Sequence, residues 1–503
     1  MIYRALLVTT MTALGSEAAS SDPQFIDASD AFPIDHVYSG GWEHFVGGGA
    51  AVFDCNGDQR PDIFAAGGTS LARLFTSGPG PKVTFELATD FPALTGVTGA
   101  YPIDIDGDEI IDLAVLRVGP NVLLKGHGGC SFSDMSADWG FASKDGWSTA
   151  FSATWEAGQD RPTLAVGNYV DRADPDGPFE ACDANELYRP SGKGYGTPTR
   201  LEPGFCALSM LFSDWQRSGS AELRISNDRH YYVRGGYEQM WRLSPLGERS
   251  TGDGWQRVSI WGMGIASADL ERDGFPDVML TSMGDQVLHF NTGGSISPAP
   301  FAQGASAHRP HIGDDGRPST GWHAEFGDID NDGLNDLFIA KGNVDQMPSN
   351  AMRDPNNLLM QNPDGTFQEA SVAAGLATME RSRGAALADF NLDGKLDVLV
   401  VNRRAPLELW LNASATTGNS ASLDLRTPGA NKFAIGAWVE IDRGDSTEWH
   451  ERTIGGGHVS GSLLPVHIGM GPKTELNVRV WWPDGSASDW QKIKAGQRLT
   501  LRP

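Results

Sequence analysis

Short apolar runs, each about the length of one strand, follow one another between polar turns along most of the chain. Five of these runs come directly after a cluster of carboxylates. They are Ile63–Gly68, Leu113–Val118, Val278–Met283, Leu337–Gly342 and Val398–Arg403. Short apolar runs bounded by turn residues and rich in β-branched or aromatic residues predict β-strands. The pattern therefore predicts an all-β protein built from a repeated turn-and-strand unit.

The carboxylate clusters share one spacing, with oxygen-bearing side chains at positions 1, 3, 5 and 9 of a loop. Five copies keep the pattern: Asp54, Asn56, Asp58, Asp62; Asp104, Asp106, Asp108, Asp112; Asp269, Glu271, Asp273, Asp277; Asp328, Asp330, Asp332, Asp336; and Asp389, Asn391, Asp393, Asp397. Two weaker copies begin at Trp155 and Asp214. The seven first positions lie 50 to 61 residues apart, which is enough for four short strands and their turns.

A second landmark follows the same period. Late in most units a turn precedes an aromatic residue flanked by polar ones, as around Phe132 and Phe367. The segment Pro23–Ser29 has this pattern but precedes the first acidic loop. We therefore expect the N-terminus to supply the outer strand of the last unit and to close a ring. The sequence predicts a seven-bladed β-propeller over residues 23–412.

The acidic loops have the chemistry of calcium sites. Calcium takes about six to eight oxygen ligands in flexible geometry, and a turn with oxygens at positions 1, 3, 5 and 9 can wrap it. An EF-hand shares the opening spacing, but it needs flanking helices and a glutamate at position 12, whereas here a strand begins at once. We expect about five structural calcium sites, with no metal in the copies at Trp155 and Asp214.

The C-terminal part follows a different pattern. Residues 413–422 are rich in Ser, Thr and Gly and are expected to form a linker. Residues 423–503 carry no acidic loop. Alternating apolar residues between glycine-rich turns predict a small antiparallel β domain there.

Charge and cysteine content narrow the cellular context. The formal net charge of −25 over 503 residues disfavours nucleic acid as a partner. Residues 1–19 resemble a secretory signal peptide, no other run could span a bilayer, and we expect a secreted or periplasmic monomer. A disulfide between Cys182 and Cys206 is favoured. A bond between Cys55 and Cys130 is the weaker expectation, and free thiols remain open for each pair.

The motifs also resemble known families. The acidic loops look like FG-GAP/VCBS repeats, similar to those of integrin α-subunit propellers. The segments Ile435–Val439, His467–Gly471 and Val480–Gly485 look like an ASPIC/UnbV domain, and the combination resembles the cartilage acidic protein family. The resemblance implies calcium binding and export. It does not settle a biochemical activity.

Large or ionisable residues stand near the starts of the strands expected to line the central channel: Glu43, His44, Trp147, Trp261, His323, Arg381 and Arg383. One hypothesis is an enzyme of lyase, isomerase or cyclase type, with His44 or His323 as general acid/base and Arg383 holding an oxyanion. The alternative is that these residues cap the channel structurally. A cluster at His308–Asp315 is either a second metal site or a solvated polar turn.

The leading interpretation is a secreted calcium-binding module that recognises a protein, glycan or small-molecule ligand through one propeller face. The enzyme hypothesis and a purely adhesive extracellular role remain as alternatives. No sequence motif names the ligand.

Overall fold

The computed structural model describes residues 23–174, 181–228, 235–313, 316–415 and 417–503. The predicted signal peptide, 1–19, lies outside the described residues. Strands dominate, and the described helical elements are short: η1 (Ser29–Ala31), η2 (Trp42–His44), η3 (Thr251–Asp253), η4 (Phe301–Gln303) and α1 (Ser371–Ala374). The predicted all-β class is confirmed.

Between residues 25 and 412, the described strands group into units of four. Units 1 to 4 are β2 (Ala50–Phe53), β3 (Asp62–Ala65), β4 (Arg73–Ser77), β5 (Phe85–Leu87); β6 (Val97–Ile103), β7 (Asp112–Gly119), β8 (Val122–Gly126), β9 (Phe132–Asp134); β10 (Gly146–Thr154), β11 (Thr163–Asn168), β12 (Asn185–Tyr188), β15 (Thr199–Leu201); and β16 (Ala207–Ser213), β17 (Glu222–Asn227), β18 (Gln239–Leu243), β19 (Leu246–Glu248). A small ribbon, β13 (Pro190–Ser191) with β14 (Gly194–Tyr195), is inserted in unit 3.

Units 5 to 7 repeat the arrangement. They are β20 (Gly262–Ala268), β21 (Asp277–Ser282), β22 (Val287–Asn291), β23 (Ile296–Pro298); β24 (Gly321–Gly327), β25 (Asp336–Lys341), β26 (Asn357–Gln361), β27 (Phe367–Glu369); and β28 (Ser382–Ala388), β29 (Asp397–Asn402), β30 (Glu408–Asn412), β1 (Phe25–Asp27). Within each unit the strands pair antiparallel in the order given. A short pairing of β7 with β10 joins the sheets of units 2 and 3.

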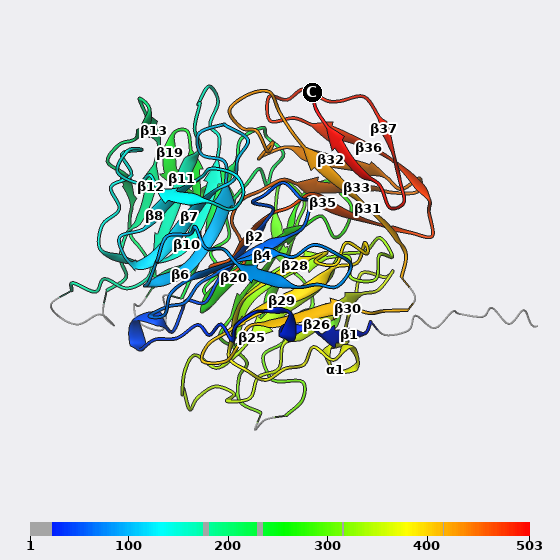
Figure 1. The fold of residues 1–503 in the computed structure, drawn as a ribbon, viewed down its shortest axis with the longest axis horizontal. Coiled ribbons are helices and arrows are strands. Elements are labelled where there is room, and N and C mark those ends of the chain that lie inside the picture. Colours follow the sequence, from blue (N-terminus) through cyan, green and yellow to red (C-terminus); the bar gives the residue numbers. More distant parts are fainter. Residues whose placement is uncertain (1–22, 175–180, 229–234, 314–315, 416) are drawn as a thin grey trace, which may run out of the picture.

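The N-terminal strand completes the last unit, as the sequence predicted. In β1, Phe25 pairs with Asn412 and Asp27 pairs with Trp410 of β30, antiparallel. Figure 1 shows the two strands side by side, although they stand at opposite ends of the repeat region. The first described strand therefore ties unit 7 to the start of the chain.

The first strand of each unit is its inner strand. Each inner strand packs against the inner strand of the next unit, and β28 packs against β2. These strands are almost wholly buried and contain small residues such as Ala51, Gly99 and Gly384. In units 2 to 7 the pairing register shifts near the start of the inner strand, which is the signature of a β-bulge.

The C-terminal domain forms two small sheets. Its strands are β31 (Asn419–Leu425), β32 (Trp438–Asp442), β33 (Thr447–Glu451), β34 (Gly461–Leu463), β35 (Val466–Gly471), β36 (Glu475–Trp481), β37 (Gln491–Lys494) and β38 (Arg498–Leu501). The sheets have the orders β35-β31-β38 and β33-β32-β36-β37, and they enclose a core that includes Leu423, Val439, Ile468 and Val478.

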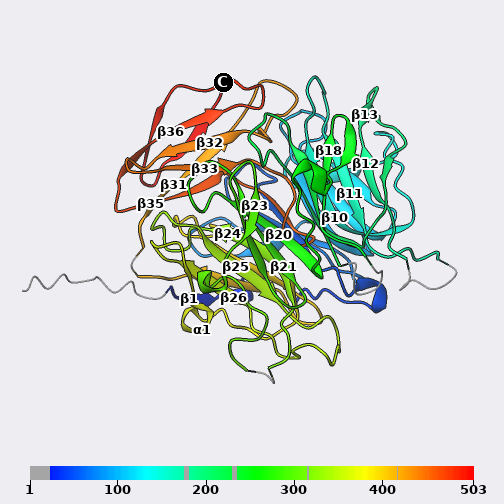
Figure 2. The same ribbon diagram turned by 180° about the vertical axis from the view of Figure 1, so that it is seen from behind.

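Two details of this domain differ from the expectation. Residues 419–422, expected in the linker, belong to β31, in which Ala421 and Leu423 are buried and the intervening Ser422 is half-buried. The domain is also not wholly antiparallel, since β31 and β38 run parallel. Figures 1 and 2 show the domain, in orange and red, lying against one end of the repeat region.

Candidate functional site

The five acidic loops adopt one backbone conformation. We call them loops 1, 2, 5, 6 and 7 after their units: Asp54–Asp62, Asp104–Asp112, Asp269–Asp277, Asp328–Asp336 and Asp389–Asp397. In all five, the residues at positions 4 and 6 have positive φ. Glycine fills position 4 in loops 1 and 2 and position 6 in loops 5, 6 and 7. The sharp turn therefore needs two left-handed residues, of which one is glycine each time.

The carboxylate at position 1 caps this turn. Asp54 accepts hydrogen bonds from the N–H groups of Gly57 and Gln59 at 2.7 and 2.8 Å. Asp389 accepts the N–H groups of Asp393 and Gly394 at 3.0 and 2.8 Å. The first carboxylate thus shapes the loop through local hydrogen bonds.

The carboxylate at position 9 joins parts of its unit through hydrogen bonds from two backbone N–H groups. We call this pair of hydrogen bonds the position-9 clasp. In every one of the five loops, one oxygen accepts the N–H of position 2 and the other accepts an N–H from the third strand of the unit or its end. For Asp112 the donors are Ile105 and Gly126, both at 2.8 Å. Burial raises the pKa of Asp112 to about 8, although these two N–H groups lower it. Position 9 therefore has a structural role of its own.

Positions 1, 3 and 5 bring carboxylates together. Ligand oxygens of Asp104, Asp106 and Asp108 lie within 4.8 Å of one another, and so do those of Asp328, Asp330 and Asp332. Burial, followed by the charges of Asp332 and Asp330, raises the pKa of Asp328 well above its usual value. Among the described residues, Oδ1 of Asp106 and Oδ1 of Asp328 have no hydrogen-bond partner. An all-oxygen donor set with unsatisfied buried oxygens fits a hard divalent cation such as calcium.

Loop 2 already has a protein cation beside it. The Lys125 ammonium, from β8, contacts the carboxylates of both Asp106 and Asp108, at 2.6 Å in the second case. The two units with weak copies of the acidic loop also pair a carboxylate with a protein cation. In unit 3, Arg189 forms a paired contact with Glu156, at 2.7 and 3.0 Å. In unit 4, Arg249 contacts both oxygens of Glu222, at 2.5 and 2.6 Å.

The three residues predicted as catalytic are buried. His44 is 6% exposed and His323 is 4% exposed. The Arg383 guanidinium donates to the carbonyls of Phe45 at 2.9 Å, of Ser382 and Asn343 at 3.0 and 3.1 Å, and of Val344. It also stacks on the Trp322 ring at 4.1 Å. All three guanidinium nitrogens of Arg383 therefore donate to backbone carbonyls.

The predicted convergence at one mouth is partly observed. Trp147, Trp322 and Phe45 belong to one buried cluster, with Trp261 packed against it. Glu43 and Arg381 instead form ion pairs with Arg172 and Asp345. The starts of the inner strands therefore meet in a packed aromatic cluster. None of the three predicted catalytic residues lines the large cavity described below.

No sequence motif predicted which residues occupy the centre of the repeat region. A segment of the C-terminal domain, Ile454–Leu463, is inserted among the inner strands; we call it the inserted segment. Its contacts with units 1 to 7 involve Ala51, Ala100, Ala153, Leu211, Ile265, His323 and Gly384. Strand β34, at the end of this segment, pairs parallel with β2.

His458 lies at the tip of the inserted segment and is fully buried. Its backbone N–H donates to Nδ1 of His323 at 3.1 Å, and its ring packs on Trp322. Burial lowers the pKa of His458 to about 3, so the imidazole is neutral. The run Gly455–Gly457 before it was visible in the sequence. Its close approach to other backbones, with Gly457 N–H donating to the Ile265 carbonyl at 2.6 Å, follows only from the fold.

The rest of the C-terminal domain covers several of the loops. Arg217, in the weak loop of unit 4, lies between the rings of Trp438 and Trp449, at 4.2 and 4.0 Å. Glu451 accepts from Ser213 and from the N–H of Asp214 at 2.5 and 2.7 Å. Unit 4, with its weak acidic loop, is thus held to the domain by charged protein groups.

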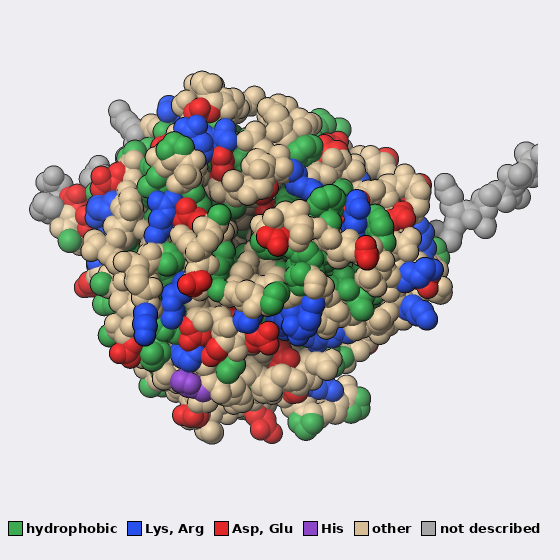
Figure 3. All heavy atoms as spheres, turned by 90° about the horizontal axis from the view of Figure 1, so that it is seen from above, with side chains coloured by type: hydrophobic (Ala, Val, Ile, Leu, Met, Phe, Trp, Pro, Cys, Tyr) green, Lys and Arg blue, Asp and Glu red, His purple; other side chains and the backbone are tan. Residues whose placement is uncertain are grey.

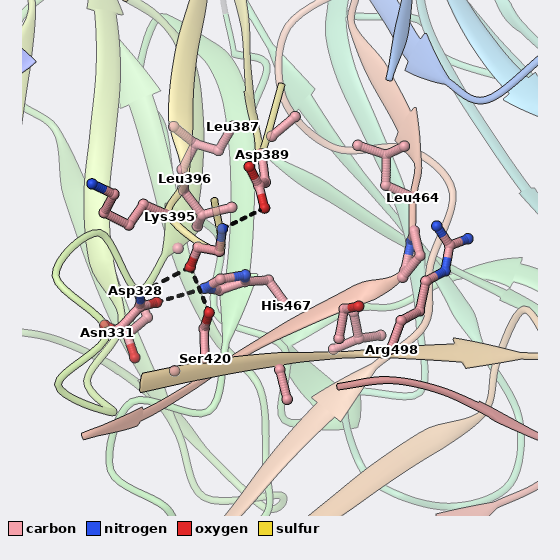
Figure 4. Close-up of a pocket in the computed structure, with 18 of the residues that line it drawn as sticks. Asp328, Asn331, Leu387, Asp389, Lys395, Leu396, Ser420, Leu464, His467 and Arg498 are labelled. Atoms are coloured by element: carbon pink, nitrogen blue, oxygen red, sulfur yellow. Dashed lines mark hydrogen bonds between the residues drawn. The ribbon is translucent and has the colours of Figure 1, made fainter. Parts of the chain in front are cut away.

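A cavity of about 950 Å³ lies between the repeat region and the C-terminal domain. Asp328, Asn331 and Asp389 line it from loops 6 and 7, and His467 and Arg498 line it from the C-terminal domain (Figure 4). Its walls combine carboxylates, amides, hydroxyls and backbone with basic side chains such as Lys395 and apolar ones such as Leu387 and Leu464. Figure 3 shows acidic and basic side chains interspersed over the face seen from above, so the net charge does not form one large patch there.

Both cysteine pairs form disulfides. Cys182 bonds to Cys206, the favoured expectation, and Cys55 bonds to Cys130. The second bond joins loop 1 to the outer turn of unit 2. Two disulfides fit an oxidising compartment, extracellular or periplasmic. None of the helices in the described part of the chain has the length and apolarity of a membrane span.

His311 of the predicted His308–Asp315 cluster contacts protein groups. Its Nε2 lies 3.0 Å from Ser371 Oγ and its Nδ1 lies 3.2 Å from Asn357 Nδ2. His308 lies 3.5 Å from Asp285. Residues 314–315 lie outside the described residues, so the acidic half of the cluster is not placed.

These features define an all-β repeat protein with an acidic turn before the second strand of its units and a separate β domain packed on those turns. The family described as ASPIC and UnbV matches residues 427–503, and the FG-GAP-like repeat matches residues 54–115 and 328–400. The chain therefore carries FG-GAP-like repeats and an ASPIC and UnbV domain, as its motifs indicated.

Its relatives include cartilage acidic protein 1. The human protein is 41% identical over 82 residues, which cover 16% of this chain and 12% of that protein. The Mus musculus protein is 35% identical over 94 residues, covering 18% and 15%. The homology is weak, and the matched stretch spans less than a sixth of either relative.

Solved structures similar to this chain include BBS1N in complex with ARL6DN, at 10% identity and a TM-score of 0.47, covering 78% of this chain and 98% of that one. Another is the extracellular domain of the putative hybrid two-component system BT4673 from B. thetaiotaomicron. It has 8% identity and a TM-score of 0.44, covering 95% of this chain and 59% of that one.

Proposed function

We propose that this protein is a secreted or periplasmic calcium-binding interaction module. In this proposal a seven-bladed β-propeller is stabilised by calcium in loops 1, 2, 5, 6 and 7, and the C-terminal domain caps the loop side. The observation that carries the proposal is the inserted segment. It touches the inner strands of units 1 to 7, so the centre is a packed core and the binding surface lies outside it.

Four observations support a closed propeller. The units follow the same strand order, successive inner strands pack on one another, and β28 returns to β2. The pairing of β1 with β30 joins the two ends of the repeat region. A ring of units leaves only short, protected sheet edges, which suits an exported monomer.

Calcium would act on the stability of the loops. In this proposal the ligands come from positions 1, 3 and 5, with position 9 holding the adjoining strands. A bound cation removes the repulsion between three or four neighbouring carboxylates and links binding to folding. The Lys125 ammonium contacts the loop 2 carboxylates, so the proposal places the weakest calcium affinity there.

An interaction role fits the geometry better than catalysis at the channel. His44, His323 and Arg383 are packed among protein groups, and the inserted segment closes the channel between them and the loop side. The C-terminal domain covers the loop side. The proposal therefore assigns the opposite face to recognition of a protein or glycan. Trp42, 37% exposed and edge-on to Trp147, belongs to that face.

The test is calcium removal. The purified protein should bind several calcium ions by elemental analysis after gel filtration, and EDTA should lower its melting temperature by many degrees. Calcium should restore the melting temperature, and equimolar magnesium should restore it less, because magnesium keeps its own water shell. Absence of bound calcium together with an unchanged melting temperature would sink the proposal.

A further inference from the structure

The C-terminal domain encloses loop 6 and leaves loop 1 open. A Cβ added to Gly469 of β35 would lie 1.7 Å from Oδ2 of Asp328, so the strand passes directly over this carboxylate. In loop 1, by contrast, a Cβ on Gly57 would meet nothing within 4 Å. One loop is thus covered by another domain, and the other is open.

Three hydrogen bonds fasten the C-terminal part to loop 6. The N–H of Gly418 donates to the Asp330 carbonyl, and the N–H of Gly471 donates to the Asn331 carbonyl, both at 2.7 Å. Nε2 of His467 lies 2.7 Å from Oδ1 of Asn331 (Figure 4). The backbone of loop 6 is therefore part of the domain interface.

Beneath the C-terminal domain, one carboxylate oxygen of loop 6 receives no hydrogen bond from the described residues. Asp328 is only 7% exposed, and its Oδ1 finds no hydrogen-bond partner among the described residues. Its carboxylate groups with those of Asp330 and Asp332, all within 4.8 Å. A buried acceptor without a donor, beside two further carboxylates, suits a positively charged ligand.

Among the described residues, no lysine or arginine forms an ion pair with Asp328, Asp330 or Asp332, although the charges of Arg272 and Arg443 act to lower the pKa of Asp332. Arg272 donates to the Gly333 carbonyl at 2.5 Å, beside the cluster. Arg443 donates to Glu448 at 2.6 Å, so its charge is shared with another carboxylate of the interface. Negative charge remains in excess under the domain.

We propose that loop 6 is an interdomain calcium site, in which cation binding and docking of residues 419–503 are thermodynamically linked. This inference rests on the proposed calcium binding. Enclosing three carboxylates is unfavourable without a cation and favourable with one, so the cation stabilises the docked domain. By reciprocity, the docked domain tightens the cation. A cavity of about 290 Å³ between Asp332 and the segment Thr417–Asn419 gives a hydrated ion an approach to the loop.

The experiment compares Asp332→Asn with Asp58→Asn, the same change at position 5 of the covered and the open loop. Calcium stoichiometry is measured by elemental analysis of the full chain. Hydrogen exchange of the β35 peptide is measured in calcium and in EDTA by mass spectrometry. Wild type should exchange at β35 about tenfold or more slowly in calcium, within the usual range of coupling energies.

Each variant should lose one calcium ion. Only Asp332→Asn should lose the calcium-dependent protection of β35, while β25 in the same unit stays protected. If Asp332→Asn does not fold, Asp330→Asn replaces it. Loss of the ion with unchanged β35 protection overturns the linkage and leaves the calcium proposal standing. An unchanged ion count in Asp332→Asn overturns the site, and a wild type without calcium overturns both proposals.

Discussion

The backbone N–H of His458 donates a hydrogen bond to Nδ1 of His323 at 3.1 Å, joining the C-terminal domain to an inner strand of unit 6. The bond requires a neutral imidazole with its lone pair on Nδ1. It lies among backbone contacts that the inserted segment makes with its neighbours. A histidine predicted as a possible general base is thus an acceptor in an interdomain contact.

The inserted segment should be sensitive to any atom added to the small inner strands. A Cβ on Gly99 would lie 2.0 Å from the Val459 carbonyl oxygen. We expect Gly99→Ala to lower the free energy of unfolding by about 1–3 kcal/mol, because an overfilled site must shift backbone. Urea unfolding followed by fluorescence checks this. The matched control is Gly41→Ala, whose Cβ would meet nothing within 4 Å. Equal stability of the two variants would contradict the packing argument.

The position-9 clasp predicts a stability effect that does not depend on calcium. Asp277 is 1% exposed and accepts the N–H groups of Leu270 and Asn291, both at 2.9 Å. Asp277→Asn would turn an amide N–H₂ toward one of these donors, at a cost of about 1–3 kcal/mol. Unfolding measured in EDTA should show this loss.

Asp273→Asn, at position 5 of the same loop, is the control. We expect it to lower stability in calcium and to have little effect in EDTA. If Asp277→Asn also left the free energy of unfolding unchanged in EDTA, the role of Asp277 would be metal binding alone. That result would contradict the structural role of the position-9 clasp.

Much of the repeat region could be predicted because its signals are local. The Asp-rich spacing places a turn, and the apolar run after Asp62 or Asp336 places the second strand of its unit. The N-terminal strand was predictable because Phe25 stands in the same local pattern as Phe132. The family resemblance of the C-terminal domain was likewise carried by short motifs.

The features of the fold that the sequence did not predict depend on contacts between residues far apart in the chain. No local signal at Gly455–Gly457 predicts that this turn enters the repeat region, since its hydrogen-bond partners Met210 and Ile265 lie about 190 to 250 residues away. The Cys55–Cys130 bond was left open because connectivity is not encoded in spacing. Asp328 was predicted as a ligand like the other first-position carboxylates, but its cover by Gly469 is a property of domain docking.

Arg217 should contribute to holding the C-terminal domain. Its guanidinium lies between Trp438 and Trp449, and a partly desolvated cation between two rings contributes about 1–2 kcal/mol. Arg217→Met keeps the aliphatic stem and removes the charge. We expect faster hydrogen exchange in β33 and a lower urea midpoint. Arg60→Met, in loop 1, is the control for removing one surface arginine. If hydrogen exchange in β33 is unchanged in Arg217→Met, the contact of Arg217 with the two rings does not help to hold the C-terminal domain.

Acidification should weaken the interface through Glu448. Burial would raise the pKa of this carboxyl, but His450 and Arg443 outweigh it and hold the pKa at about 2. Because the folded pKa lies below the usual value near 4.3, the contribution is complete above that value and is lost as pH falls toward 2. The free-energy difference between wild type and Glu448→Gln, measured in EDTA, should therefore shrink by up to about 3 kcal/mol over this range. Glu475→Gln, which removes an exposed partner of Lys492, should show no such large change. A difference between wild type and Glu448→Gln that stays constant with pH would mean that Glu448 is not held ionised by these charges.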